Sequence, residues 1–364
     1  MSHNGQDIST ELCAQVETAI AQQTPMTIQG GQSKPWYGNP ALANATPLVV
    51  KQHRGITNYE PTELVLTARC GTPLADIEAA LATENQQLPF EPPHFGETAT
   101  LGGTIASNLS GPARPWAGAA RDLVLGCRII NGKGEILSFG GEVMKNVAGY
   151  DVSRLMCGAL GTLGVLLEVS LKVLPNPQQT VTVVTPLDEQ SALQQMCHYA
   201  GQPLPINAAC YHASQLYLRL AGTEAAVQQA VSQLPGETLI GAESTAFWQQ
   251  LREHQLDFFT NNTNPLWRLS VPADTPPMPV EGDWLYDWGG AQRWLVSTAS
   301  AEAIRQAALA VGGHATLYRA DAAMRQTVAA FQPLEPGLLR YQRQLKQAFD
   351  PKGIFNPQRL YSEL

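Results

Sequence analysis

The stretch ETATLGGTIASNLSG, residues 97–111, consists almost entirely of small residues. Small side chains bury little apolar surface, so this run is poorly suited to a hydrophobic core. Gly102 and Gly103 lack a Cβ atom and let the backbone approach another group closely. The short hydroxyl and amide side chains around them can bind a polar ligand. The run alone fits two interpretations equally well: a backbone wall against a bulky flat ligand, or a tight Gly-Gly turn before a buried helix.

A second pair of glycines lies near the start of the chain, in PMTIQGGQSK, residues 25–34. We predict a short strand at Met26–Ile28 and a sharp turn at Gly30 and Gly31. A strand that ends in two glycines can present successive N–H groups as an anion-binding nest, and Lys34 adds a positive charge. A plain turn is the alternative.

Composition limits the classes of function. The 364 residues are 44% hydrophobic and 15% charged, which is typical of a globular protein and long enough for two domains. The net charge of −8 and the absence of a basic run argue against nucleic-acid binding. The six cysteines form no C-x-x-C pair, so we expect no metal site and no iron–sulfur cluster in this chain. Scattered cysteines, a polar N-terminus and no long apolar run predict a cytoplasmic protein.

The first half alternates short strands and helices, which predicts an α/β layer. We expect helix 8–23 to be capped by Ser9 or Thr10, and Asp151 to cap a short helix. Asn131-Gly132 is a strong hairpin signal. The other expected elements are strands Leu48–Val50, Gly55–Tyr59, Leu64–Ala68 and Val165–Val173, helix Leu74–Glu84, irregular chain at Phe90–Phe95, hairpin strands Leu123–Ile130 and Glu135–Phe139, and a loop at 146–150.

The second half alternates strands and helices twice, which suggests a ferredoxin-like cap. We expect a domain at 1–177, a cap at 178–320, and a segment 321–364, helical to about 349, that returns to the first domain. The expected cap strands are Thr180–Thr185, Asn207–His212, Gln215–Leu220, Leu266–Val271, Trp284–Trp288 and Arg293–Ser297, and the expected helices are 187–200, 223–234, 243–256 and 301–311.

Several ordered motifs now point to one family. They are QGGQSK, CGTPLADIEAAL, TLGGTIASNLSG, RDLVLG, KNVAGYDVSRLMCGALGTLGV and FDPKGIFNPQRL. Together they resemble the vanillyl-alcohol-oxidase-type (PCMH) FAD-binding fold and, more narrowly, the FAD-binding E subunits of glycolate oxidase. The resemblance implies an α+β fold, in which a PCMH-type domain of two α/β subdomains binds FAD beneath a ferredoxin-like cap.

The resemblance also implies roles for particular residues. The FAD pyrophosphate would be held by Gly30, Gly31, Gln32, Ser33 and Lys34. The adenosine, ribityl and ring portions would be lined by Thr98, Thr100, Gly102, Gly103, Ser107, Asn108 and Gly111. Backbone would be offered to the flavin by Gly161, Gly164 and Val165, and Asn356 would return near the ring.

Catalytic residues are harder to assign. Oxidation of a 2-hydroxy acid needs a base near the hydroxyl and a cation for the carboxylate. Related dehydrogenases carry a paired-histidine metal motif and a GDGN-like segment, and this sequence has neither. His314 is the remaining base candidate, with Arg319 as carboxylate partner, although a histidine in a strand core is the commoner explanation. Leu160 stands where the relatives usually have Glu.

The function implied is that of an FAD-containing subunit of a glycolate oxidase (dehydrogenase) complex. Implied partners are a larger FAD-binding catalytic subunit and an iron–sulfur subunit, with glycolate as substrate and only peripheral contact with the inner membrane through the complex. Two alternatives remain: a self-sufficient FAD-dependent dehydrogenase of a 2-hydroxy acid or alcohol, and a structural subunit that keeps the fold without turnover.

We predict non-covalent FAD. Some relatives attach FAD through a His or Cys in the first loop, and residues 29–34 contain neither. Acid denaturation should therefore release all flavin into the supernatant, measured by absorbance. Yellow colour that stays on the precipitated chain would contradict this.

Overall fold

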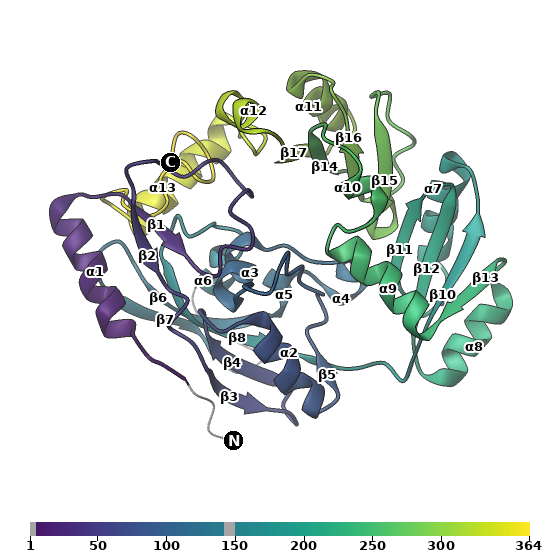
Figure 1. Ribbon diagram of the computed structural model, residues 1–364, viewed down its shortest axis with the longest axis horizontal. Helices are drawn as coiled ribbons and strands as arrows, with labels where there is room; N and C mark the ends of the chain where they lie inside the picture. Colours follow the sequence, from purple (N-terminus) through teal and green to yellow (C-terminus); the bar gives the residue numbers. More distant parts are fainter. Residues whose placement is uncertain (1–4, 142–149) are drawn as a thin grey trace.

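The chain is organised around two large β-sheets built from different parts of the sequence (Figure 1). A computed structural model describes residues 5–141 and 150–364. His3 and residues 146–149 of the expected loop lie outside these ranges. A five-stranded sheet uses strands between residues 56 and 172, and an eight-stranded sheet uses residues 179–319.

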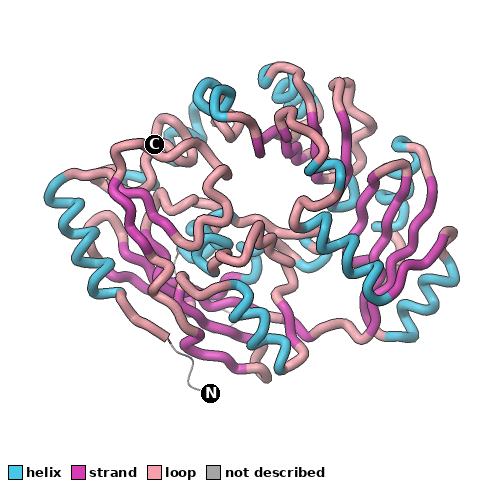
Figure 2. The backbone as a smooth tube through the Cα atoms, viewed as in Figure 1, coloured by secondary structure: helices cyan, strands magenta, loops and turns pink. Residues whose placement is uncertain are grey.

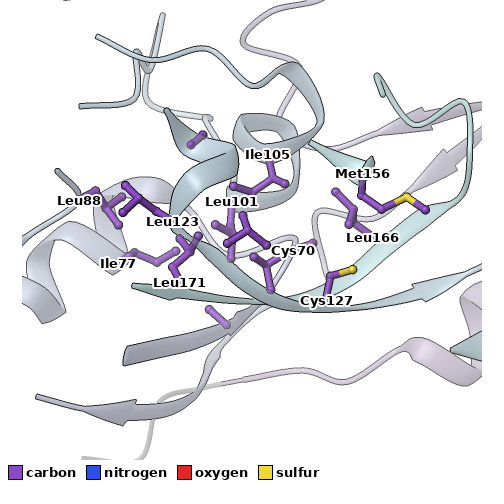
Figure 3. Close-up of a cluster of buried hydrophobic side chains, with 14 of the residues drawn as sticks. Cys70, Ile77, Leu88, Leu101, Ile105, Leu123, Cys127, Met156, Leu166 and Leu171 are labelled. Carbon is purple, nitrogen blue, oxygen red and sulfur yellow. The ribbon is translucent and has the colours of Figure 1, made fainter. Parts of the chain in front are cut away.

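The five-stranded sheet is antiparallel, and its central strand lies between two cores. Leu166 and Leu171 pack with helix α3 (Leu101–Ser107), whereas Val165 and Leu167 pack with helix α1 (Ser9–Gln22). Figure 3 shows side chains of α3 against those of the sheet. The strand order is β3 (Ile56–Glu60), β4 (Val65–Arg69), β8 (Val165–Lys172), β6 (Val124–Ile130) and β7 (Ile136–Gly140), with the β6–β7 hairpin as predicted.

Short elements connect and cover this sheet (Figure 2). Phe90–Phe95 has no helix or strand, as expected for a segment with two prolines. Asp151 caps α6 as predicted, since its carboxylate accepts the N–H of Arg154 at 3.1 Å. The elements are α2 (Leu74–Thr83), β5 (Gln86–Gln87), α4 (Arg114–Ala117), α5 (Ala120–Leu123), α6 (Val152–Met156) and β9 (Leu174–Pro175).

A smaller layer joins the two ends of the chain. Strands β1 (Met26–Gln29) and β2 (Thr46–Val49) pair in parallel, and Phe355 forms a parallel bridge with Met26. Helix α1 packs on these strands. The predicted cap of α1 was wrong, because the helix begins at Ser9 and Asp7 accepts the N–H of Ser9 at 2.9 Å.

The eight-stranded sheet consists of two four-stranded halves. The first half has both helices of a ferredoxin-like unit, as the strand–helix alternation predicted, whereas residues 271–282 of the second half form no helix. The edge strands of the two halves pair through Tyr211 and Tyr286. Strands β13 and β17 complete the halves and were not predicted. The order is β13 (Glu237–Ile240), β10 (Gln179–Pro186), β12 (Gln215–Gly222), β11 (Ile206–His212), β15 (Asp283–Asp287), β16 (Gln292–Val296), β14 (Leu266–Ser270) and β17 (His314–Arg319). The helices are α7 (Glu189–Ala200), α8 (Glu224–Gln233), α9 (Gly241–Arg252), α10 (Asp257–Thr260), α11 (Ala301–Ala310) and the 3₁₀ turn η1 (Trp288–Gly290).

The last part of the chain forms two helices, α12 (Ala322–Thr327) and α13 (Pro336–Phe349). Residues 321–349, expected to be helical, are helical except at residues 321 and 328–335, where Pro333 precedes the Pro336 that begins α13. After α13 the chain returns to the β1 layer (Figure 1).

A buried ion pair fixes this return. Lys346 is 8% exposed and Asp350 is 1% exposed. The Lys346 ammonium donates to Asp350 and to the carbonyls of Thr162 and Phe355, at 2.7–2.8 Å. The Asp350 carboxylate also accepts the N–H groups of Ile354 and Phe355. The C-terminal end of α13 is therefore held to the loop at Thr162 and to residues 354–355 of the tail.

We predict that Lys346→Met destabilises the protein by about 3–5 kcal/mol, because it leaves the buried carboxylate of Asp350 without its cation. Urea unfolding measures the difference. Arg343→Met, on the exposed side of the same helix, should stay within about 0.5 kcal/mol of the wild type. Equal midpoints for the two variants would contradict the role given to the ion pair.

Candidate functional site

One cavity of about 460 Å³ lies where the β1 layer, α3, the turn at 158–164 and the tail meet. This volume is within the range of cofactor sites, roughly 300–1,000 Å³. Predicted site residues that line it are Gly30, Gly31, Gln32, Ser33, Lys34, Thr100, Gly102, Gly103, Ser107, Gly161, Gly164 and Asn356. The structure thus brings the two glycine segments of the sequence into one wall.

The two segments touch through their backbones. A Cβ atom on Gly31 would lie 1.4 Å from the carbonyl oxygen of Thr98, and one on Gly30 would lie 2.7 Å from the Thr100 hydroxyl. Real Cβ atoms essentially never come closer than 3.0 Å to such atoms. The first loop therefore needs glycine at residue 31 because another backbone occupies the space.

The amides of this loop are available to a ligand. In the described part of the chain, no acceptor takes the N–H groups of Gly31, Gln32 and Ser33. Gln32 has a φ of 53°, in the left-handed region, directly after the two glycines. Successive N–H groups in such a turn form a concavity that attracts anions.

The central run forms the short helix α3, and Thr100 is its N-cap. The Thr100 hydroxyl accepts the N–H of Gly103 at 3.3 Å. Gly102 is tightly enclosed, because an added Cβ would lie 2.8 Å from the Cβ of Cys70. Both earlier interpretations therefore describe part of the structure: the glycines form the first turn of a buried helix, and that turn also lines the cavity.

The turn at 158–164 supplies a further wall. Gly158, Leu160 and Gly161 all have a positive φ. Glycine adopts this conformation easily, which explains the glycines at 158 and 161, whereas it is uncommon for a residue with a side chain such as Leu160. Asn356 connects this turn to β1, since its side chain donates to the carbonyl of Leu160 at 2.6 Å and accepts the N–H of Ile28 at 2.8 Å. A Cβ on Gly161 would lie 2.8 Å from the Asn356 amide.

Four predicted residues do not line the cavity. Thr98 supports it from behind through its carbonyl contact with Gly31. Asn108 ends α3 and accepts the N–H of Arg121 at 3.2 Å. The carbonyl of Gly111 accepts the indole N–H of Trp288 at 2.9 Å, across to the eight-stranded sheet. Val165 is fully buried in the core beneath α1.

Sequence reasoning missed several lining residues, most importantly Tyr37, Cys70, Arg325 and Arg359. The arginines lie in α12 and in the tail, far from the glycine motifs. Further lining residues are Thr27, Ile28, Gln29, Pro35, Pro40, Ala41, Val50, Ala106, Leu160 and Leu166. Arg359 lies within the FDPKGIFNPQRL motif. Its positive charge was the one feature of the sequence that could have indicated a role for it at the cavity.

The cavity is electrostatically positive. Burial lowers the pKa of Lys34 to about 8, while the carboxylate of Glu253 acts in the opposite direction. Burial lowers the pKa of Arg359 to about 10, and the neighbouring Arg325 adds to that effect. Lys34 donates to the Ser33 hydroxyl and to the carbonyl of His94, at 3.1 and 3.2 Å. Positive groups that lose hydration in this way favour an anionic ligand.

His314 and Arg319 are not brought together. They lie at opposite ends of β17, five residues apart, which is roughly 17 Å of extended strand. His314 is exposed and neither residue lines the cavity. The Arg319 guanidinium lies 4.9 Å from the ring centroid of Trp36 and 3.1 Å from Nδ1 of His254. The two residues therefore cannot act as a base and anchor on one small substrate.

Aromatic side chains fill the region between the first loop and the eight-stranded sheet. Trp36 packs on Phe95 and Tyr318, with ring centroids 5.4 and 4.9 Å apart. Tyr37 packs on Tyr318 at 5.6 Å, and its hydroxyl accepts a hydrogen bond from Arg268 at 3.1 Å. A second cavity beside this cluster measures about 20 Å³, enough for about one water molecule.

Within residues 5–141 and 150–364, no three His, Cys, Asp or Glu side chains form a group that could hold a metal ion. Among the helices described, none is both long enough and apolar enough to cross a bilayer.

The fold and the family comparison define the class of protein. A family model described as "FAD binding domain" matches residues 9–140. The solved structure of an alkyldihydroxyacetonephosphate synthase is similar, with a TM-score of 0.66 over 96% of this chain and 76% of that chain. The identity is 16%, so this likeness concerns the fold alone. The chain has an α+β, PCMH-type fold with an FAD-binding domain.

Relatives narrow the class. The glycolate oxidase subunit GlcE of Escherichia coli (strain K12) is 51% identical over 98% of this chain and 99% of its own length. A D-lactate dehydrogenase of Anaerostipes hadrus is 29% identical over 49% of this chain and 37% of its own length. Glycolate oxidase subunit GlcD of Bacillus subtilis (strain 168) is 28% identical over 44% of this chain and 34% of its own length. The chain belongs to the family of the glycolate oxidase subunit GlcE.

The cavity residues fit FAD. Glycines 30, 31, 102 and 161 leave no room for side chains, and the loop amides are free to bind an anion. Two arginines and a lysine line the cavity, which suits a cofactor that carries two phosphates.

We predict that Gly31→Ala weakens FAD binding by about 10- to 100-fold, because the new methyl group strains the backbone contact with Thr98 by about 1–3 kcal/mol. Quenching of flavin fluorescence during titration of the apoprotein measures the affinity. Gly337→Ala is the matched control, since nothing lies within 4 Å of a Cβ there. Unchanged affinity in Gly31→Ala would contradict the geometry.

Proposed function

We propose that this chain is the FAD-binding subunit of a glycolate oxidase (dehydrogenase) complex that converts glycolate and an acceptor to glyoxylate and the reduced acceptor. The observation that carries the proposal is the 51% identity to GlcE over 98% of the chain, together with a cavity that fits FAD. The chain's own residues would bind and orient the cofactor, which it holds non-covalently. FAD, when bound, supplies the two-electron acceptor.

We further propose that a larger FAD-binding subunit leads the alcohol oxidation. The packing of Trp36, Phe95 and Tyr318 supports this, because these rings fill the space between the first loop and the eight-stranded sheet. Arg268 and Arg319 could anchor a carboxylate, yet Arg268 binds the Tyr37 hydroxyl and Arg319 stacks on Trp36. A glycolate molecule would have to displace these rings to reach the cavity from that side.

The partners proposed are the larger FAD subunit and an iron–sulfur subunit. GlcE and GlcD, to which the chain is similar, are both named as glycolate oxidase subunits, which supports an assembly of several chains. The complex would work in the cytoplasm and contact the inner membrane peripherally.

We expect the purified chain with FAD to be yellow and nearly inactive towards glycolate. The experiment adds glycolate under anaerobic conditions and follows bleaching of the visible flavin band, then adds a dye acceptor. The Gly31→Ala protein serves as the control for free flavin. Addition of the partner subunits should start turnover.

Each other result favours a different function. Fast bleaching of the isolated chain would identify a self-sufficient 2-hydroxy-acid dehydrogenase. Failure to bind FAD would indicate a structural subunit without turnover.

A further inference from the structure

Two arginines from outside the glycine motifs lie at the cavity beside loop 35–41. Arg325 comes from α12, just after the eight-stranded sheet, and Arg359 comes from the tail. The loop is the direct continuation of the glycine turn at 30–34. Three separate parts of the chain therefore meet at this part of the cavity wall.

The hydrogen-bond acceptors of both guanidinium groups are neutral carbonyl oxygens. Arg359 donates to the carbonyl of Pro35 at 2.8 Å and to that of Asn39. Arg325 donates to the carbonyl of Gly38 at 2.8 Å. Among residues 5–141 and 150–364, neither arginine has a carboxylate within 4.0 Å. Carbonyl oxygens orient a guanidinium but do not neutralise its charge.

The two charges also act on each other. Burial lowers the pKa of Arg359 to about 10, and the positive charge of Arg325 contributes in the same direction. Two partly buried cations that repel one another are unfavourable unless an anion compensates them. Arginine forms paired hydrogen bonds with phosphate, which makes phosphate a suitable anion.

We propose that Arg325 and Arg359 form a phosphate-binding subsite of the cavity, which takes a diphosphate ester and thereby holds α12 and the tail against loop 35–41. This inference rests on the proposed FAD-binding function and adds residues that the glycine motifs do not contain. The ligand class is a nucleoside diphosphate group, either within FAD or as free ADP.

The loop and the tail are already connected in a way that such a ligand would reinforce. The Asn39 N–H donates to the carbonyl of Arg359 at 3.0 Å. The Asn39 side chain donates to the carbonyl of Gln358 at 2.9 Å and accepts the N–H of Ala330 at 2.8 Å. A phosphate group bound to Arg359 would restrain the same tail segment that Asn39 holds. A bound ligand should therefore protect the tail from proteolysis.

The test compares ligands with and without phosphate on the full-length apoprotein. Arg359→Met and Arg325→Met should each weaken FAD and ADP binding about 10- to 100-fold, the size expected for a hydrogen bond to a charged group. Riboflavin, which lacks phosphate, should bind each variant as it binds the wild type. Arg343→Met, on the exposed side of α13, is the control, and Arg359→Lys should recover part of the affinity because it keeps the charge.

Two further measurements use the wild-type protein and therefore do not depend on a variant that folds correctly. For the wild type, rising salt should weaken ADP and FAD binding more than riboflavin binding, since salt screens charge. Trypsin cleavage after Arg359 or Lys352 should slow with ADP or FAD, and remain unchanged with riboflavin.

The outcomes separate this inference from the function on which it rests. Wild-type FAD affinity retained in both methionine variants would overturn the subsite and leave FAD binding intact. Equal loss of riboflavin and ADP affinity would also overturn it, because the arginines would then only support the fold. A wild type that binds no FAD would reject the subsite and the proposed function together.

Discussion

The cavity depends on the contact between two stretches of backbone, at Gly31 and Thr98. No side chain fits between them, because an added Cβ would overlap the Thr98 carbonyl. Two residues later Thr100 caps α3, and Leu101 and Ile105 of that helix are fully buried against the five-stranded sheet. The position of the first loop is thus determined by core packing.

Much of this arrangement could be predicted from local sequence patterns. Glycine pairs after a strand, the Asn-Gly hairpin and the repeated strand–helix alternation each specify a local geometry, and the structure contains all three. The glycine segments also indicated which backbone lines the cavity, because Gly30, Gly31 and Gly161 have no room for a Cβ atom. Asn356 was predicted through the similarity of its motif, and it bridges β1 and the turn at 158–164.

The remainder depends on tertiary contacts that a local pattern cannot show. Arg359 lines the cavity because the tail folds back onto β1, and Arg325 lines it from α12. Only the motif around Arg359 gave a signal, and nothing in the neighbouring residues indicates the position of Arg325. His314 and Arg319 are close in sequence but separated along an extended strand. Val165 and Asn108 adjoin true lining residues, yet one enters the core and the other ends a helix. In each case long-range packing decides which residue faces the cavity.

The bridge made by Asn356 has a consequence for the order of events during synthesis. Its side chain bonds to Ile28, 328 residues earlier in the chain. At about 5–20 residues per second, the ribosome makes the first loop about 16–66 s before its partner in the tail. Throughout that interval β1 lacks its connection through Asn356 to the turn at 158–164, so this wall of the cavity is completed only when the end of the chain has been made.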